Sequence, residues 1–84
     1  MNWKDYSYVI RGKNRKLVLL ALETQKMPTQ VAKELKINLP HISRALKELE
    51  LRGLAKCLTP SERVGRLYIL TKEGKEVLKK VKGV

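Results

Sequence analysis

The segment PHISRALK, residues 40–47, combines short polar side chains with two cations and contains no carboxylate. At about 100° per residue, Arg44 and Lys47 lie within about 40° of the pole opposite Ile42, so a helix here would point both outward. An exposed cationic helix can enter a major groove, which is about 12 Å wide. There an arginine can donate two hydrogen bonds to a guanine edge, and a lysine suits a phosphate. The pattern indicates binding to double-stranded DNA.

We expect further contacts in neighbouring segments. Free backbone N–H groups and short polar side chains at the start of the preceding helix suit a phosphate, although helix capping alone also accounts for them. Basic side chains in a later loop can reach an adjacent groove or backbone, although Glu62 dilutes that signal. An ordinary solvated face is the alternative for every exposed cation. The candidate DNA-binding residues are Thr29, Gln30, Pro40, His41, Ser43, Arg44, Lys47, Arg63 and Arg66.

Helices must position this face. Residues 13–23 (KNRKLVLLALE) are good helix formers and apolar on nearly every side, which suggests burial against a partner subunit. Residues 28–52 read as a helix-turn-helix, with helices at 28–35 and 39–52. Asn38 is the expected N-cap of the second of these helices, and Gly53 its left-handed end. The predicted buried positions are Val31, Ala32, Leu35, Ile37, Ile42, Ala45, Leu46 and Leu49.

After this pair of helices the periodicity changes to that of strands. Residues 54–58 and 66–70 are strand candidates that form a hairpin, the wing, over 54–70. Thr71 is the expected N-cap of a last helix over 72–82, in which Gly74 allows close approach of another element. Residues 1–12 read either as a helical turn opened by Asp5 or as an extended arm.

Residues 30–54 (QVAKELKINLPHISRALKELELRGL) resemble winged-helix transcription regulators of the multiple-antibiotic-resistance and arsenical-resistance types, especially small archaeal ones. Residues 41–49 are similar to their recognition helix, and residues 65–74 (GRLYILTKEG) to their second wing strand and the start of their final helix. The similarity covers residues 13–82. The usual glycine of the turn is replaced by Lys36, for which a left-handed backbone would cost roughly 1–2 kcal/mol.

The element order and this resemblance predict one fold: mostly α with a β-hairpin wing, a winged helix-turn-helix in a single domain over residues 1–84. The resemblance implies a transcriptional regulator that binds double-stranded DNA sequence-specifically, with helix 39–52 in the major groove and the wing on its flank. We expect a homodimer, because two such domains about 34 Å apart can read a palindrome. The alternatives are a winged helix that docks protein or RNA, and a sensor that binds a metal or inducer between subunits.

Composition supports a polyanionic partner and excludes several other classes. Nineteen Lys and Arg against eight Asp and Glu give a net charge of +11, which favours nucleic acid. The longest apolar run, residues 17–22, is far shorter than the roughly 20 residues of a membrane span. A single cysteine, Cys57, excludes an internal disulfide, and His41 has no chelating neighbours. We therefore expect no enzyme, no metal or cofactor and no membrane, and a cytoplasmic, nucleoid-associated protein.

Trp3, Tyr6 and Tyr8 could stack on bases, but near a helix start we expect them to act as packing anchors. Arg11, Lys13, Arg15 and Lys16 form a second basic cluster, which either touches the flanks of the DNA or only keeps the protein soluble. Both alternatives apply equally to all four cations of this cluster.

Overall fold

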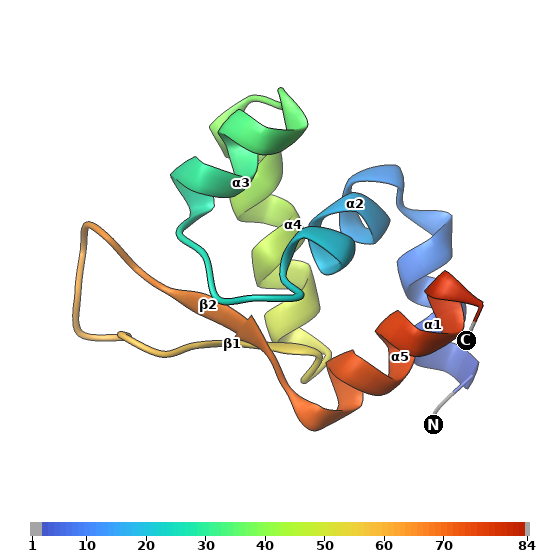
Figure 1. Ribbon diagram of the computed structural model, residues 1–84. Coiled ribbons are helices and arrows are strands. Elements are labelled where there is room, and N and C mark those ends of the chain that lie inside the picture. Colours follow the sequence, from blue (N-terminus) through green and yellow to red (C-terminus); the bar gives the residue numbers. More distant parts are fainter. Residues whose placement is uncertain (1–2, 84) are drawn as a thin grey trace.

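A computed structural model of the chain describes residues 3–83, which form five helices and a two-stranded hairpin (Figure 1). The hairpin projects on one side of α4, and α1 and α5 lie together on the other side (Figure 1). This arrangement confirms the predicted mostly helical fold with a β-hairpin wing. The elements are α1 (Trp3–Arg11), α2 (Lys13–Ala21), α3 (Pro28–Leu35), α4 (Leu39–Leu51), β1 (Ala55–Cys57), β2 (Tyr68–Leu70) and α5 (Lys72–Lys82).

The first helix was the undecided part of the sequence. Residues 3–11 are helical and carry Asp5 in the first turn, where a carboxylate stabilises the helix by its interaction with the helix dipole. Val9 faces inward and is fully buried. The N-terminal segment is therefore a helix of the core and not an extended arm, although residues 1 and 2 of the predicted segment lie outside the described part.

Helix α2 lies at the centre of the hydrophobic core. Val18, Leu19 and Leu22 are fully buried, and the helix contacts α1, α3, α4 and α5 of its own chain. Its apolar character on nearly every side is thus accounted for within one subunit. The apolar faces of α2 therefore give no reason to expect a partner subunit there, because α1 supplies cover that the sequence prediction did not include.

The turn between α3 and α4 has the strained backbone that the sequence predicts. Lys36 has φ 57° and ψ 42°, the left-handed conformation, and the Ile37 N–H donates to the Ala32 carbonyl oxygen at 3.1 Å. Asn38 is the N-cap residue of α4, but its side chain makes no capping hydrogen bond. Pro40 removes one of the N–H donors that such a cap would use, and the His41 N–H bonds to the Asn38 carbonyl oxygen at 3.0 Å.

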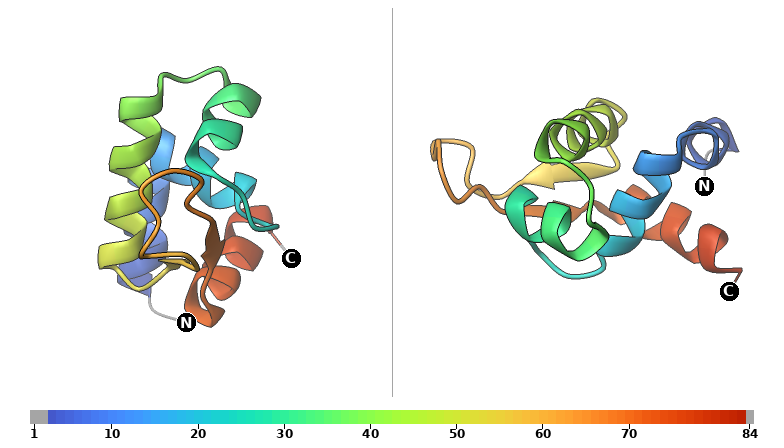
Figure 2. Two further views of the ribbon diagram at one scale, coloured as in Figure 1. Left: turned by 90° about the vertical axis from the view of Figure 1, so that its left-hand side faces the viewer. Right: turned by 90° about the horizontal axis from the view of Figure 1, so that it is seen from above.

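The wing is shorter in its paired part than predicted. Strands β1 and β2 are antiparallel, with Ala55 opposite Leu70 and Cys57 opposite Tyr68. The other edge of β2 pairs with Lys26, whose N–H and carbonyl oxygen bond to Tyr68 at 3.0 and 2.8 Å. The long loop between the strands extends away from the helices (Figure 2). The segment before α3 thus fixes the hairpin against the helix-turn-helix.

The start of α5 is locked to the end of α4. The Thr71 hydroxyl accepts from the Gly74 N–H at 3.1 Å, as an N-cap should, and donates to the Gly53 carbonyl oxygen at 2.6 Å. A Cβ at Gly74 would lie 1.9 Å from the Leu54 carbonyl oxygen, so only glycine fits there. Gly53 has φ +74°, which ends α4 as predicted. No helix within residues 3–83 has the length and apolarity needed to cross a membrane.

Candidate nucleic-acid interface

The two faces of α4 separate as its periodicity predicts. Ile42, Ala45, Leu46 and Leu49 are buried, with at most 1 % of each residue exposed. Within residues 3–83, Arg44 and Lys47 take part in no ion pair and no side-chain hydrogen bond. The acid-free half of α4 therefore leaves its cations available to a ligand. The exposed predicted residues of α4 are Pro40, His41, Ser43, Arg44 and Lys47.

On one side of α4 a hollow of about 440 Å³ separates the helix from the wing. Ser43 and Lys47 of α4, Thr29 at the start of α3, and Arg63 and Arg66 of the wing loop line this wing-side hollow. The fold thus brings together side chains from each of the segments that the sequence singled out. The charged residues of its lining are three cations and one carboxylate, that of Glu50 in the far half of α4.

On the other side of α4 a second hollow, of about 330 Å³, separates it from the start of α2. His41 and Arg44 of α4 line this α2-side hollow together with Lys13 and Asn14. Four of the five predicted residues of α4 are therefore divided between two hollows, Pro40 lines neither, and α4 forms the ridge between them.

The wing arginines differ in their surroundings. The Arg66 guanidinium donates from Nε to the Glu62 carbonyl oxygen at 2.6 Å and from Nη2 to the Pro60 carbonyl oxygen at 3.3 Å. It therefore holds the loop in shape, a role that the sequence did not predict. Arg63 is exposed, and Val64 beside it is 86 % exposed at the loop.

The start of α3 shows the capping that was the alternative for its polar residues. The Gln30 Oε1 accepts from the Met27 N–H at 2.8 Å, which satisfies a backbone donor at the helix end. Thr29 makes no such bond, and it lines the wing-side hollow. Both side chains remain exposed.

The second basic cluster does not act as a unit. Arg15 is half-buried: its Nε and Nη2 donate to the Tyr8 carbonyl oxygen at 2.9 and 2.7 Å, and its Nη1 lies 3.5 Å from Glu48 Oε1. Its guanidinium carbon also lies 3.8 Å from the centroid of the Tyr8 ring. Arg11, Lys13 and Lys16 are exposed. Arg15 is thus a structural residue that joins α1, α2 and α4.

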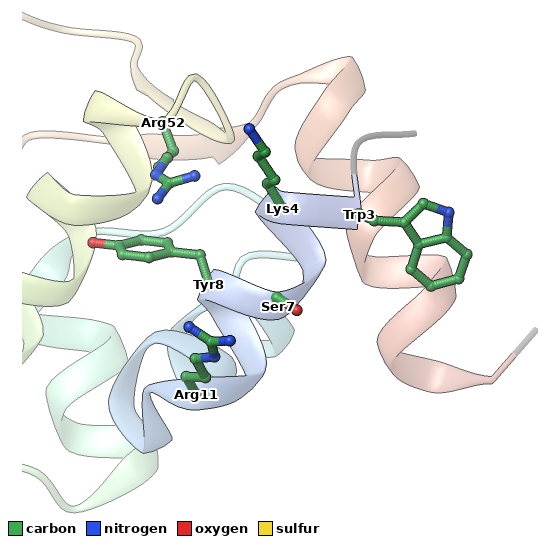
Figure 3. A pocket seen from close by; sticks show the side chains of 6 residues that line it. All are labelled: Trp3, Lys4, Ser7, Tyr8, Arg11 and Arg52. Atoms are coloured by element: carbon green, nitrogen blue, oxygen red, sulfur yellow. The ribbon is translucent and has the colours of Figure 1, made fainter.

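A second arginine completes this contact. The Arg52 guanidinium lies beside the Tyr8 ring (Figure 3), with its carbon 4.1 Å from the ring centroid. Arg52 Nη1 also lies 3.3 Å from Asp5 Oδ1. Two guanidinium groups cannot occupy the same ring face at these distances, so the tyrosine ring lies between them. We call Tyr8, Arg15, Arg52, Asp5 and Glu48 the tyrosine clamp. Residue types alone do not indicate this clamp, because its members are separated by up to 47 positions.

The other aromatic residues of α1 also act in packing. The rings of Trp3 and Tyr6 meet edge to face, with centroids 5.9 Å apart, and the Lys80 Nζ lies 4.6 Å from the centroid of the Trp3 ring. Trp3 therefore links α1 to α5, and it remains 62 % exposed. Cys57 is half-buried in β1. Across residues 3–83, no group of three or more His, Cys, Asp or Glu could hold a metal ion.

In sequence, the chain matches no protein-family model and no curated relative. In structure, it is similar to Lactococcus lactis ZitR in complex with DNA, at 25 % identity and a TM-score of 0.73 over 83 % of this chain and 49 % of that one. It is also similar to the MarR family transcription regulator SP03579, at 22 % identity and a TM-score of 0.78 over 95 % and 55 %. The chain thus spans about half the length of these two proteins.

A third structure matches over nearly its whole length. TubR from Bacillus thuringiensis serovar israelensis, bound to 24 bp of tubC, gives a TM-score of 0.80 at 18 % identity over 99 % of this chain and 95 % of that one. These similarities confirm the predicted resemblance to the multiple-antibiotic-resistance type, whereas the archaeal and arsenical-resistance parts of it stay predictions. The chain has the winged-helix fold of MarR-type transcription regulators.

Proposed function

We propose that this protein is a transcriptional regulator that binds double-stranded DNA sequence-specifically, with the first half of α4 in the major groove and the wing on its flank. The observation that carries this proposal is the exposed, acid-free cationic face of α4, raised between two hollows. ZitR and TubR share this fold and have been solved with DNA, which supports the proposal. Binding to chromosomal DNA would place the protein at the nucleoid, in the cytoplasm.

The residues have different roles in this proposal. Arg44 lies near the centre of the outward face and reads a guanine edge through two hydrogen bonds, with His41 and Ser43 as adaptable partners. Lys47 binds a phosphate. Arg63 reaches the backbone or the minor groove beside the wing, while Arg66 shapes the loop that presents it. Pro40, Thr29 and Gln30 lie where the backbone of the duplex passes the starts of α4 and α3.

The proposal includes a homodimer, on the ground that two recognition helices about 34 Å apart read two half-sites one turn apart. Because α2 is covered within its own chain, we place the contact between subunits on another helix. Trp3 and Ile10 share one face of α1, and they are 62 % and 43 % exposed. Analytical ultracentrifugation tests the dimer, and a monomer alone at high protein concentration would contradict it.

Selection of bound fragments from a random DNA pool is the decisive test of the function. The expected result is an enriched sequence, with two half-sites spaced by about one helical turn if the protein binds as a dimer. With about six phosphates neutralised per protomer, log K should fall with log salt concentration at a slope near −5. A pool without enrichment would contradict sequence-specific binding.

The rival function is a winged helix that docks a protein or RNA. Such domains often carry acidic or apolar residues where Arg44 and Lys47 lie in this chain. A complex with a protein partner that is insensitive to salt, together with no measurable affinity for duplex DNA, would favour the rival. The cationic face of α4 favours DNA.

A further inference from the structure

In the α2-side hollow, the proposed function assigns DNA contacts to His41 and Arg44 of α4 and none to the residues that α2 contributes. A helix that lies in a major groove has a phosphate backbone on each of its two sides. The wing-side hollow, with Lys47 and Arg63, accounts for one backbone. The α2-side hollow lies on the opposite side of α4 and extends to the first residues of α2.

We propose that the α2-side hollow receives the second phosphate backbone of the duplex and that Lys13 is its phosphate contact. This inference rests on the proposed function. It extends the protein–DNA surface beyond the helix-turn-helix and the wing to α2, so that cations from separate elements hold the two strands on either side of α4. It also divides the second basic cluster, because Lys13 binds DNA and Arg15 does not.

The charges in the hollow favour an anion. Its lining includes Lys13, Arg15 and Arg44, and one carboxylate, that of Glu48. Arg15 pairs with that carboxylate at 3.5 Å, which removes it as a competitor for the remaining cations. Lys13 is exposed, and within residues 3–83 it takes part in no ion pair. Asn14 and His41 add hydrogen-bonding groups at the same place.

The position of Lys13 is fixed by its neighbours. Two residues further along the chain, Arg15 bonds to the Tyr8 carbonyl oxygen on one side and to Glu48 of α4 on the other. The tyrosine clamp therefore holds the start of α2 beside α4. Arg44 lines the hollow and also belongs to the outward face of α4, so DNA held by Arg44 lies beside the hollow that Lys13 lines.

The test compares Lys13→Gln with Lys75→Gln, a matched change of an exposed lysine on α5 that lines neither hollow beside α4. Affinity for the selected duplex is measured by fluorescence anisotropy between 50 and 200 mM salt. One phosphate contact contributes about 0.9 to the slope of log K against log salt concentration. Between 50 and 200 mM salt, the affinity of Lys13→Gln should therefore fall by a factor about 3.5 times smaller than the factor for the wild type. Lys75→Gln should keep the wild-type slope, and Lys13→Arg should restore it.

Hydroxyl-radical footprints give a second measurement that changes of fold would not mimic. Lys13→Gln should lose protection only on the side of each half-site that faces away from the wing. A wild-type slope and a complete footprint for Lys13→Gln, while the wild type binds normally, would overturn this inference and leave the proposed function intact. A wild type that binds no duplex at 50 mM salt would overturn both.

Discussion

Two sets of cations in this protein have the same chemistry and opposite surroundings. Arg44 and Lys47 project from the first half of α4 and have no carboxylate partner within residues 3–83. Arg15 and Arg52 lie on either face of the Tyr8 ring, and each also lies close to a carboxylate. A basic residue is therefore available for DNA only where the fold places no carboxylate beside it. It also predicts that stability and DNA affinity depend on different residues.

The largest effect should come from beneath the binding face. Leu49 is on α4 but fully buried, so Leu49→Ala should lower the free energy of unfolding by about 2–5 kcal/mol through lost burial and a residual cavity. Urea unfolding followed by circular dichroism measures it. Leu51→Ala is the matched control on the same helix, since Leu51 is 80 % exposed and should change stability little. Equal losses for the two variants would contradict the packing described.

Next is the change that acts on affinity alone. Arg44→Ala should weaken binding to the selected site by about 1–3 kcal/mol and relax the preference at one base pair, because one pair of hydrogen bonds to a base is lost. Its unfolding curve should match that of the wild type, since the side chain is exposed and unpaired. Anisotropy with single-base variants of the site gives both quantities. If Arg44→Ala binds the site with wild-type affinity, Arg44 is not the residue that recognises the base.

The tyrosine clamp should behave in the opposite way. Tyr8→Leu removes two contacts between a cation and a ring, each worth about 0.5–1 kcal/mol, so the free energy of unfolding should fall by about 1–2 kcal/mol. DNA affinity of the folded protein should stay within about twofold of the wild type, because Tyr8 itself lines neither hollow beside α4 and Arg15 keeps its bonds to the backbone oxygen of residue 8. Tyr8→Phe keeps the ring and serves as the control. A Tyr8→Phe variant as unstable as Tyr8→Leu would show that the hydroxyl, and not the ring, matters.

The smallest effect belongs to the turn. Lys36→Gly should raise the free energy of unfolding by roughly 0.5–1 kcal/mol, because relief of a left-handed backbone outweighs the entropy cost of glycine. Lys33→Gly, in the right-handed helix α3, should lower it by about 1 kcal/mol. Thermal unfolding compares the pair. Destabilisation by both changes would mean that the Lys36 side chain stabilises the turn.

The binding face could be predicted from the sequence because it depends on a local rule. A helix turns by about 100° per residue, so the burial of Ile42 and Leu46 determines that Arg44 and Lys47 point outward. The N-cap of α5 and the glycine ends also follow from residue type and neighbours. Exposure of the candidate site could therefore be predicted, but its division into two hollows depends on how α2 and the wing pack on α4.

The clamp could not be predicted, because it depends on contacts between distant segments. Arg15 differs from Lys13 and Lys16 only in what surrounds it, namely Glu48, which lies 33 positions later, and the Tyr8 carbonyl oxygen. The same cause explains why the apolar faces of α2 suggested a partner subunit. Its apolar faces are covered by helices from both ends of the chain, and α1 could not be distinguished from an extended arm by residue type alone.

The most direct test of the central claim is a titration of ¹⁵N-labelled protein with the selected duplex, followed by NMR. If the exposed half of α4 reads DNA, the largest amide shifts should occur over residues 39–47 and in the wing loop, and the amides of α5 should stay near their free positions. Shifts that concentrate on α5, with α4 unchanged, would contradict the account.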